Sequence, residues 1–262
     1  MPVLYEKRGH IGLVTLSRPE ARNAWCQEFY TGLAEHFTRM EDDKDIRVVI
    51  LTGDEAGRAF SAGADLKDPN THTVASAADF IERLPKWKDF TFNLLTDFPK
   101  PIVAVVNGYA IGIGCILTYC CDLIVASERA EWRMPQVALG ITPAYGGSVR
   151  LARWVGKGLA MRLAMGFPLR AEEAYRMGLA QWLVPHEKLM EQAMEVAEHI
   201  AGLPPLAARI AKESLNRGQD IPNLKDASLV DAYRFMALEL TEDKAEAHTA
   251  WRERRKPKIR GR

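Results

Sequence analysis

The sequence predicts an α/β fold built on a largely parallel, covered sheet. Three short apolar segments, 46–53, 101–108 and 122–127, alternate along the chain with stretches of helical spacing. Apolar runs of this length, bounded by glycine or polar residues, are typical of parallel strands that helices cover on both faces. The chain has 262 residues, of which 47% are hydrophobic and 26% charged, enough for one large domain or a domain with an appendage.

The pattern of apolar residues sets the order of the elements. A hairpin over 3–16 that turns at Gly9 opens the chain, and a helical stripe of apolar residues predicts an amphipathic helix over 25–42. The next elements are a strand over 46–53, an ordered loop over 59–68, a helix from Ile81 to Leu95, a strand over 101–108, a buried helix from Gly112 to Cys121 and a strand over 122–127. From residue 150 the signals are nearly all helical, over 157–165, 170–177, 187–202, 205–216 and 225–250. We therefore expect a core over residues 1–200 and a helical C-terminal region over residues 201–262.

Charge and composition exclude several classes of protein. A net charge of +1 argues against nucleic-acid binding through charge neutralisation, although the last eleven residues hold seven basic residues and one acid. The charge-free segment 101–121 is long enough for a membrane span, but Asn107-Gly108 and two further glycines favour a strand, a turn and a buried helix. We expect no membrane association.

The cysteines, the N-terminus and the scattered histidines exclude further sites. The four cysteines have no disulfide-framework spacing, which favours a reducing compartment. Residues 1–14 lack the pattern of a signal peptide, so a cytoplasmic protein is expected. The histidines and carboxylates lack metal-ligand spacing, and the sequence has neither a dinucleotide fingerprint nor a P-loop.

Two glycine-containing turns are the strongest candidates for chemistry. Gly63-Ala64-Asp65 and Gly112-Ile113-Gly114 each follow a strand region and are expected to open a helix, where free N–H groups favour negative charge. Two such N–H groups aimed at one point would form an oxyanion hole. The alternative is that both segments are only tight turns, and spacing alone leaves that choice open.

Collinear motifs cover nearly the whole chain and together resemble one family. They are LSRPEARNAW, VVILTG, AFSAGADLK, KPIVAVVNGYAIGIGC, CDLIVAS, MPQVALGITPAYGGSVRLARWVG, AEEAYRMGLAQWLVP and RRKPKIRGR. In this order they are similar to the crotonase (enoyl-CoA hydratase/isomerase) superfamily. The resemblance implies a spiral of ββα repeats, a helical C-terminal oligomerisation region, homotrimers that often pair into homohexamers, a CoA thioester as substrate and no cofactor beyond its CoA moiety.

The resemblance also assigns residues to the site. It implies that the thioester carbonyl lies between the backbone N–H groups of Ala64 and Ile113. The residues that it implies for CoA binding are Arg22, Ala24, Ala62, Ala64, Asp65, Leu66 and Lys67. Lys67 either faces a CoA phosphate or is a solvated lysine. The basic tail is either a flexible end or places Arg254, Arg255 or Lys256 near those phosphates, and Asp122 is expected to be structural.

The acidic residues of a hydratase are missing. Two glutamates hold the water and shuttle its proton in enoyl-CoA hydratases, and the resemblance places Ile116 and Gln136 at these positions. A third acidic position, used by dienoyl-CoA isomerases, is Ala144. Isoleucine cannot transfer a proton, and a glutamine amide does not titrate usefully, although it can orient water or a carbonyl.

Substitutes for the missing acids are weak candidates in each case. Tyr145, His72 and Cys115 have the right chemistry, but a packed tyrosine, a surface histidine and a buried apolar cysteine are the more usual roles. We therefore expect an enoyl-CoA hydratase/isomerase-like enzyme that stabilises a thioester enolate. The alternatives are other enolate chemistry on an acyl-CoA (decarboxylation, C–C hydrolysis or thioester hydrolysis) and a non-catalytic CoA-binding homologue.

Overall fold

The computed structural model describes residues 2–67, 76–78, 91–144 and 146–262. The strands are β1 (Val3–Arg8), β2 (Ile11–Leu16), β3 (Val48–Gly53), β4 (Ala59–Ser61), β5 (Ile102–Val106), β6 (Tyr109–Ile111), β7 (Leu123–Ser127), β8 (Glu131–Arg133), β9 (Leu169–Arg170) and β10 (Trp182–Val184). The α-helices are α1 (Gln27–Asp42), α3 (Thr91–Asp97), α4 (Ile113–Thr118), α5 (Gly147–Val155), α6 (Lys157–Ala164), α7 (Ala171–Arg176), α8 (Leu189–Ala201), α9 (Pro205–Gly218), α10 (Leu224–Glu239) and α11 (Glu242–Arg252). Short 3-10 helices include η1 (Pro19–Ala21), η2 (Glu55–Gly57), η5 (Val137–Leu139) and η6 (His186–Lys188).

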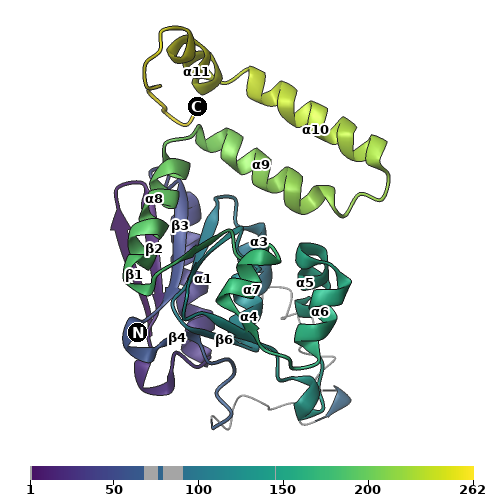
Figure 1. The fold of residues 1–262 in the computed structure, drawn as a ribbon. Coiled ribbons are helices and arrows are strands. Elements are labelled where there is room, and N and C mark those ends of the chain that lie inside the picture. Colours follow the sequence, from purple (N-terminus) through teal and green to yellow (C-terminus); the bar gives the residue numbers. More distant parts are fainter. Residues whose placement is uncertain (1, 68–75, 79–90, 145) are drawn as a thin grey trace.

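A six-stranded sheet in the order β1-β2-β3-β5-β7-β10 forms the centre of the described chain. The hairpin pair β1–β2 is antiparallel, and every other pair is parallel. All residues of β3 and β5 are buried, as their continuous apolar sequences predict. α8 packs on one face of this sheet, whereas α1, α3 and α4 lie in the larger core on the other face (Figure 1). The predicted α/β class is confirmed.

A second, smaller sheet has the order β4-β6-β8-β9. The chain passes from the large sheet to the small one three times, from β3 to β4, from β5 to β6 and from β7 to β8. Two of these crossings leave no room for a side chain. A Cβ on Gly53 would stand 2.3 Å from the carbonyl oxygen of Ala59, and one on Gly108 would stand 2.4 Å from that of Arg58. Glycine is therefore required where the two sheets meet.

The C-terminal helices α9 and α10 form a pair that extends away from the sheets (Figure 1). Lys212 of α9 is only 7% exposed, and its Nζ atom lies 2.8 Å from the carboxylate of Asp122, just before β7. This buried ion pair, which confirms a structural role for Asp122, ties α9 to the core. None of the described helices is long and apolar enough to cross a bilayer.

The basic tail is attached to α11, which argues against a flexible end, one of the two alternatives for this segment. The buried carboxylate of Asp243 accepts hydrogen bonds from the backbone N–H groups of Arg260 and Gly261, each at 2.7 Å. Arg255 makes a paired contact with Glu246 at 2.6 and 3.0 Å. Acidic residues of α11 thus hold the tail in place, and Arg255 is engaged within this chain.

Several predicted elements need correction. The segment 59–68 is not only a loop, because its first three residues form β4. The predicted helix 225–250 is two helices, α10 and α11, because Thr241 caps the start of α11 by accepting a hydrogen bond from the N–H of Lys244. Sequence analysis also missed four strands, β6, β8, β9 and β10, because strands of two to three residues carry too little periodic signal. It missed the helix α5 as well. Most of the helix predicted between Ile81 and Leu95 lies outside the described residues.

Candidate active site

The three segments that sequence analysis singled out follow three neighbouring strands of the small sheet. β4, β6 and β8 are parallel, so their carboxyl ends meet at one edge. Gly63-Ala64-Asp65 comes after β4, Gly112-Ile113-Gly114 after β6, and Pro135-Gln136 after β8. Because ligands of parallel sheets bind beyond the carboxyl ends of the strands, this edge is the candidate active site.

The turn after β4 is fixed by hydrogen bonds that leave one N–H group free. The Oγ atom of Ser61 accepts from the N–H of Gly63 at 3.2 Å, and the N–H of Trp25 donates to the carbonyl of Gly63 at 2.8 Å. Ala64 forms a β-bridge with Trp25, yet its own N–H donates to no group among the described residues. The next residues, Leu66 and Lys67, form a turn, so the helix expected there does not begin within the described part of this segment.

The turn after β6 presents the second free N–H group. Gly112 adopts a φ of 53° and is the N-cap of α4, so Ile113 is the first helical residue and its N–H has no partner within the helix. The positive φ of this turn falls on Gly112 and not on the isoleucine. The N–H of Gly112 is engaged differently, since it donates to the carbonyl of Arg133 at 2.8 Å.

The two turns lie against each other without intervening side chains. A Cβ on Gly63 would stand 2.6 Å from the carbonyl oxygen of Ile111, and one on Gly114 would stand 2.5 Å from that of Ser61. This close backbone contact brings the loops of Ala64 and Ile113 together. The sequence supplied both turns, and their adjacency comes from the pairing of β4 with β6.

The residues at the two positions where the resemblance leads one to expect glutamates are buried beside these turns. Gln136 is 9% exposed, and its Nε2 atom lies 3.6 Å from the position of a Cβ on Gly112. Its Oε1 atom is buried and has no hydrogen-bond partner in the part of the chain that the structure describes. Ile116 is 1% exposed in α4, and its Cδ1 atom lies 2.8 Å from the position of a Cβ on Gly147. A neutral amide and an aliphatic side chain therefore stand where proton-transferring acids were sought.

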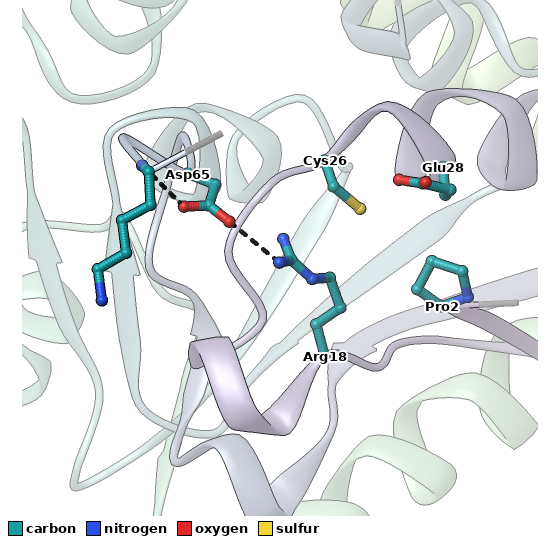
Figure 2. A pocket seen from close by; sticks show the side chains of 6 residues that line it. Pro2, Arg18, Cys26, Glu28 and Asp65 are labelled. Atoms are coloured by element: carbon teal, nitrogen blue, oxygen red, sulfur yellow. Dashed lines mark hydrogen bonds and ion pairs between the residues drawn. The ribbon is translucent and has the colours of Figure 1, made fainter. Parts of the chain in front are cut away.

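An open cavity lies beside the Ala64 turn (Figure 2). It has a volume of about 510 Å³ and is lined by Pro2, Arg18, Cys26, Glu28, Asp65 and Lys67. Asp65 accepts from the N–H of Lys67 at 3.0 Å and pairs with Arg18 at 3.0 Å. These contacts, the backbone bond first, hold the pKa of the Asp65 carboxyl below its usual value. Sequence analysis did not identify Arg18 as a cavity residue. The available indication was its place in the loop after β2, directly before Pro19.

The first-loop residues predicted for CoA binding lie at this cavity's border. The carbonyl of Ala24 accepts from Arg18 at 3.0 Å, and Ala24 itself is buried. Arg22 is exposed and adopts a left-handed conformation with a φ of 53°. Its carbonyl accepts from the N–H of Ala62 at 3.0 Å, which fastens the first loop to the Ala64 turn.

The remaining candidates gain little support. Tyr145 and His72 lie outside the described residues. Cys115 is fully buried, and burial raises the pKa of its thiol far above the ordinary value, so it offers no thiolate. Glu131 forms an ion pair with Arg133. Among the described residues, no group of three potential metal ligands occurs.

Known proteins of similar sequence and structure identify the family. A family model described as "Enoyl-CoA hydratase/isomerase" matches residues 6–262. A probable mitochondrial enoyl-CoA hydratase of Dictyostelium discoideum is 38% identical over 253 residues, covering 96% of this chain and 88% of that protein. The 2,3-dehydroadipyl-CoA hydratase of Escherichia coli is 34% identical over 261 residues, covering 99% of each chain. The crystal structure of an enoyl-CoA hydratase from Bacillus anthracis superposes with a TM-score of 0.91 at 30% identity, covering 100% of both chains. This chain belongs to the enoyl-CoA hydratase/isomerase family.

Proposed function

We propose that this acyl-CoA enzyme polarises the thioester carbonyl of its substrate between the N–H groups of Ala64 and Ile113. One observation carries the proposal: two backbone N–H groups that have no acceptor among the described residues lie on turns that touch each other. Fixed donors aimed at a developing oxyanion stabilise an enolate at little reorganisation cost, and removal of one such donor costs roughly 10²–10³-fold in rate.

Water addition to an enoyl-CoA then depends on Gln136. Its carboxamide can orient a water molecule through hydrogen bonds, but it cannot remove or return the proton. The aliphatic side chain of Ile116 can neither donate nor accept a hydrogen bond. Since positioned proton transfer contributes on the order of 10²–10⁴-fold, hydration is expected to be slower than with two glutamates at these positions.

The same two residues favour a second candidate reaction. Decarboxylation or C–C cleavage of an acyl-CoA produces the enolate by breaking a carbon–carbon bond, and in decarboxylation no base has to remove a proton first. Such chemistry needs the carbonyl donors at Ala64 and Ile113 but tolerates a neutral residue at positions 116 and 136. Thioester hydrolysis and a silent CoA-binding role are further outcomes of the test below.

We assign CoA binding to the loops around the cavity of Figure 2. The residues are those of the first loop (Arg22 and Ala24) and of the Ala64 turn (Ala62, Ala64, Asp65, Leu66 and Lys67). A backbone hydrogen bond between Ala62 and Arg22 joins the two loops. The charged residues Arg22 and Lys67 are both exposed to solvent. The assignment requires no cofactor beyond the CoA moiety.

A homotrimer or homohexamer is the proposed assembly. α10 has no buried side chain, and several of its large apolar residues are exposed, among them Tyr233, Phe235 and Met236 at 68%, 59% and 60%. Exposed apolar surface of this kind marks association sites. Light scattering coupled to gel filtration would give the mass; a monomer at micromolar concentration would contradict this assignment.

Mass spectrometry of acyl-CoA thioesters incubated with the protein in heavy-oxygen water tests the reaction. Label in a hydroxyacyl-CoA indicates hydration, label in a free acid indicates hydrolysis, and loss of carbon dioxide indicates decarboxylation. Ile116→Glu combined with Gln136→Glu is expected to raise crotonyl-CoA hydration. Ala64→Pro removes the N–H group of residue 64 and is expected to lower turnover. The proposal would be refuted if the wild-type protein turned over no thioester and Ala64→Pro bound acyl-CoA as tightly as the wild-type protein does.

A further inference from the structure

A cluster of hydrogen-bonded side chains lies at the three crossings from the large sheet to the small sheet. It consists of Glu55, Asn107, Ser127 and His186, which we name the crossing cluster. Glu55 lies between β3 and β4, Asn107 between β5 and β6, and Ser127 at the end of β7 before β8. His186 comes from a fourth segment, the connection from β10 to α8.

His186 joins two of the crossings directly. Its Nε2 atom lies 2.6 Å from Oε1 of Glu55, and its Nδ1 atom lies 3.0 Å from Oγ of Ser127. A neutral ring with its proton on Nε2 satisfies both contacts, because Nε2 then donates to the carboxylate and Nδ1 accepts from the serine hydroxyl. Ser127 is fully buried, and the imidazole is 14% exposed, so this link is shielded from solvent on the serine side.

Asn107 adds the third crossing. Its Nδ2 atom donates to the carbonyl of Gly53 at 3.0 Å and to Oε2 of Glu55 at 3.3 Å. Asn107 is 3% exposed, and its bond to Gly53 fastens the end of β5 to the end of β3. A backbone hydrogen bond joins the end of β7 to the end of β10 in a similar way, since the N–H of Glu128 donates to the carbonyl of Val184 at 2.9 Å.

Each crossing leads within one short strand to one group of the candidate site. Glu55 precedes β4 and Ala64, Asn107 precedes β6 and Ile113, and Ser127 precedes β8 and Gln136. These strands have only three residues each, so each Glu55, Asn107 or Ser127 contact lies close along the chain to a group of the site. The crossing cluster therefore links the starting points of all three site-bearing segments.

We propose that His186 is a positioning residue that controls the separation of the Ala64 and Ile113 N–H groups through Glu55, Asn107 and Ser127. The inference rests on the proposed function for its consequence, a polarised thioester carbonyl. The expected contribution is geometric rather than energetic. The carboxylate of Glu55 is 65% exposed, and a contact to a carboxylate so open to solvent adds little to stability.

The test measures carbonyl polarisation directly, with carbon-13 at the thioester carbonyl of butyryl-CoA. In the wild-type protein, binding is expected to lower the C=O stretching frequency in infrared difference spectra. In His186→Ala, the frequency shift is expected to shrink while the dissociation constant of butyryl-CoA stays unchanged. For a substrate identified by the mass-spectrometry assay, kcat is expected to fall roughly 10- to 100-fold. His186→Gln, whose amide can donate to Glu55 and accept from Ser127, is expected to restore most of the shift.

Two control variants separate positioning from general loosening. His10→Ala removes another histidine, which contacts the carbonyl of Asp45 at 2.7 Å at the hairpin turn between β1 and β2. Val196→Ala destabilises the packing of α8, where Val196 is 8% exposed, without touching the crossing cluster. Both are expected to keep the full frequency shift. A shift in His186→Ala equal to the wild-type value, or an equal reduction in Val196→Ala, would overturn the inference.

A second measurement works without a substrate. Amide hydrogen exchange at Ala64 and Ile113 in the free protein is expected to change in His186→Ala and to stay constant in His10→Ala. If wild-type protein bound butyryl-CoA with no frequency shift while exchange responded to His186, the proposed function would fail and the positioning role would stand. Exchange that does not respond at either amide would contradict the positioning role, whatever the substrate.

Discussion

Gly63 lies directly against Ile111, with the position of its missing Cβ only 2.6 Å from the carbonyl oxygen of that residue. This contact sets a steric limit on how closely the Ala64 turn approaches the Ile113 turn. Gly63 also adopts a φ of 85°, a conformation that L side chains rarely take. Both requirements fall on the residue just before the proposed oxyanion donor.

Gly63→Ala is therefore expected to separate the two turns. The strained φ should lower the free energy of unfolding by about 1–3 kcal/mol. The misplaced Ala64 N–H should reduce thioester polarisation, which the C=O stretch of bound butyryl-CoA measures. Gly140→Ala is the matched control, because Gly140 has a φ of 75° but nothing within 4 Å of its Cβ position. Equal loss of polarisation in both variants would count against the steric role of Gly63.

The buried amide of Gln136 predicts a conflict between stability and binding. Its Oε1 atom has no partner within residues 2–67, 76–78, 91–144 and 146–262, and a buried polar group left unpaired costs about 1–3 kcal/mol. Gln136→Met is thus expected to raise the free energy of unfolding by about 1 kcal/mol in urea titrations. The same variant is expected to bind acyl-CoA more weakly. Gln181→Met should instead destabilise, since Gln181 accepts from the N–H of Ile124 at 2.8 Å and donates to two carbonyls.

Lys212 and Asp122 form the buried pair that ties α9 to the core. Lys212→Met should cost about 3–5 kcal/mol, because it leaves a buried carboxylate without its cation. Burial already raises the pKa of Asp122, against the opposing effect of Lys212, and loss of the lysine should raise that pKa further. A carboxyl whose pKa is raised on folding favours the folded state at low pH, so the loss relative to the wild-type chain should grow as the pH rises above the raised pKa of Asp122 in the wild-type fold. Urea titrations at several pH values measure this, and Asp122→Asn in the same chain should remove the dependence.

The tail contact of Glu246 predicts an acid-sensitive region. Arg255, followed by the N–H of Lys258, lowers the pKa of Glu246 to about 2. A carboxyl whose pKa is lowered on folding stabilises the folded tail above its ordinary pKa of 4.5, and this contribution is lost as the pH falls from there towards 2. The protection factor of the Lys258 amide should fall over that range. Glu246→Gln should have low protection throughout, and protection that is constant with pH in the wild-type chain would contradict the assignment.

The extent of the sequence's information differs from element to element. The apolar runs of β3, β5 and β7 and the stripe of α1 predicted these elements, because each is long enough to show its period. The motifs around Ala64 and Ile113 identified both turns and implied the family to which the chain belongs. The identities of Ile116 and Gln136 also came from sequence, since they are departures from a recognisable pattern.

The tertiary structure decided what these residues touch. Strands of three residues, such as β4 and β6, carry no readable period, yet their pairing brings the two turns into contact. The orphaned Oε1 of Gln136, the ion pair of Arg18 with Asp65 and the crossing cluster around His186 join residues from distant parts of the sequence. Local sequence sets the conformation of each segment through side-chain shape and backbone freedom. Contacts between segments depend on the packing of all of them together, and only the folded chain specifies that packing.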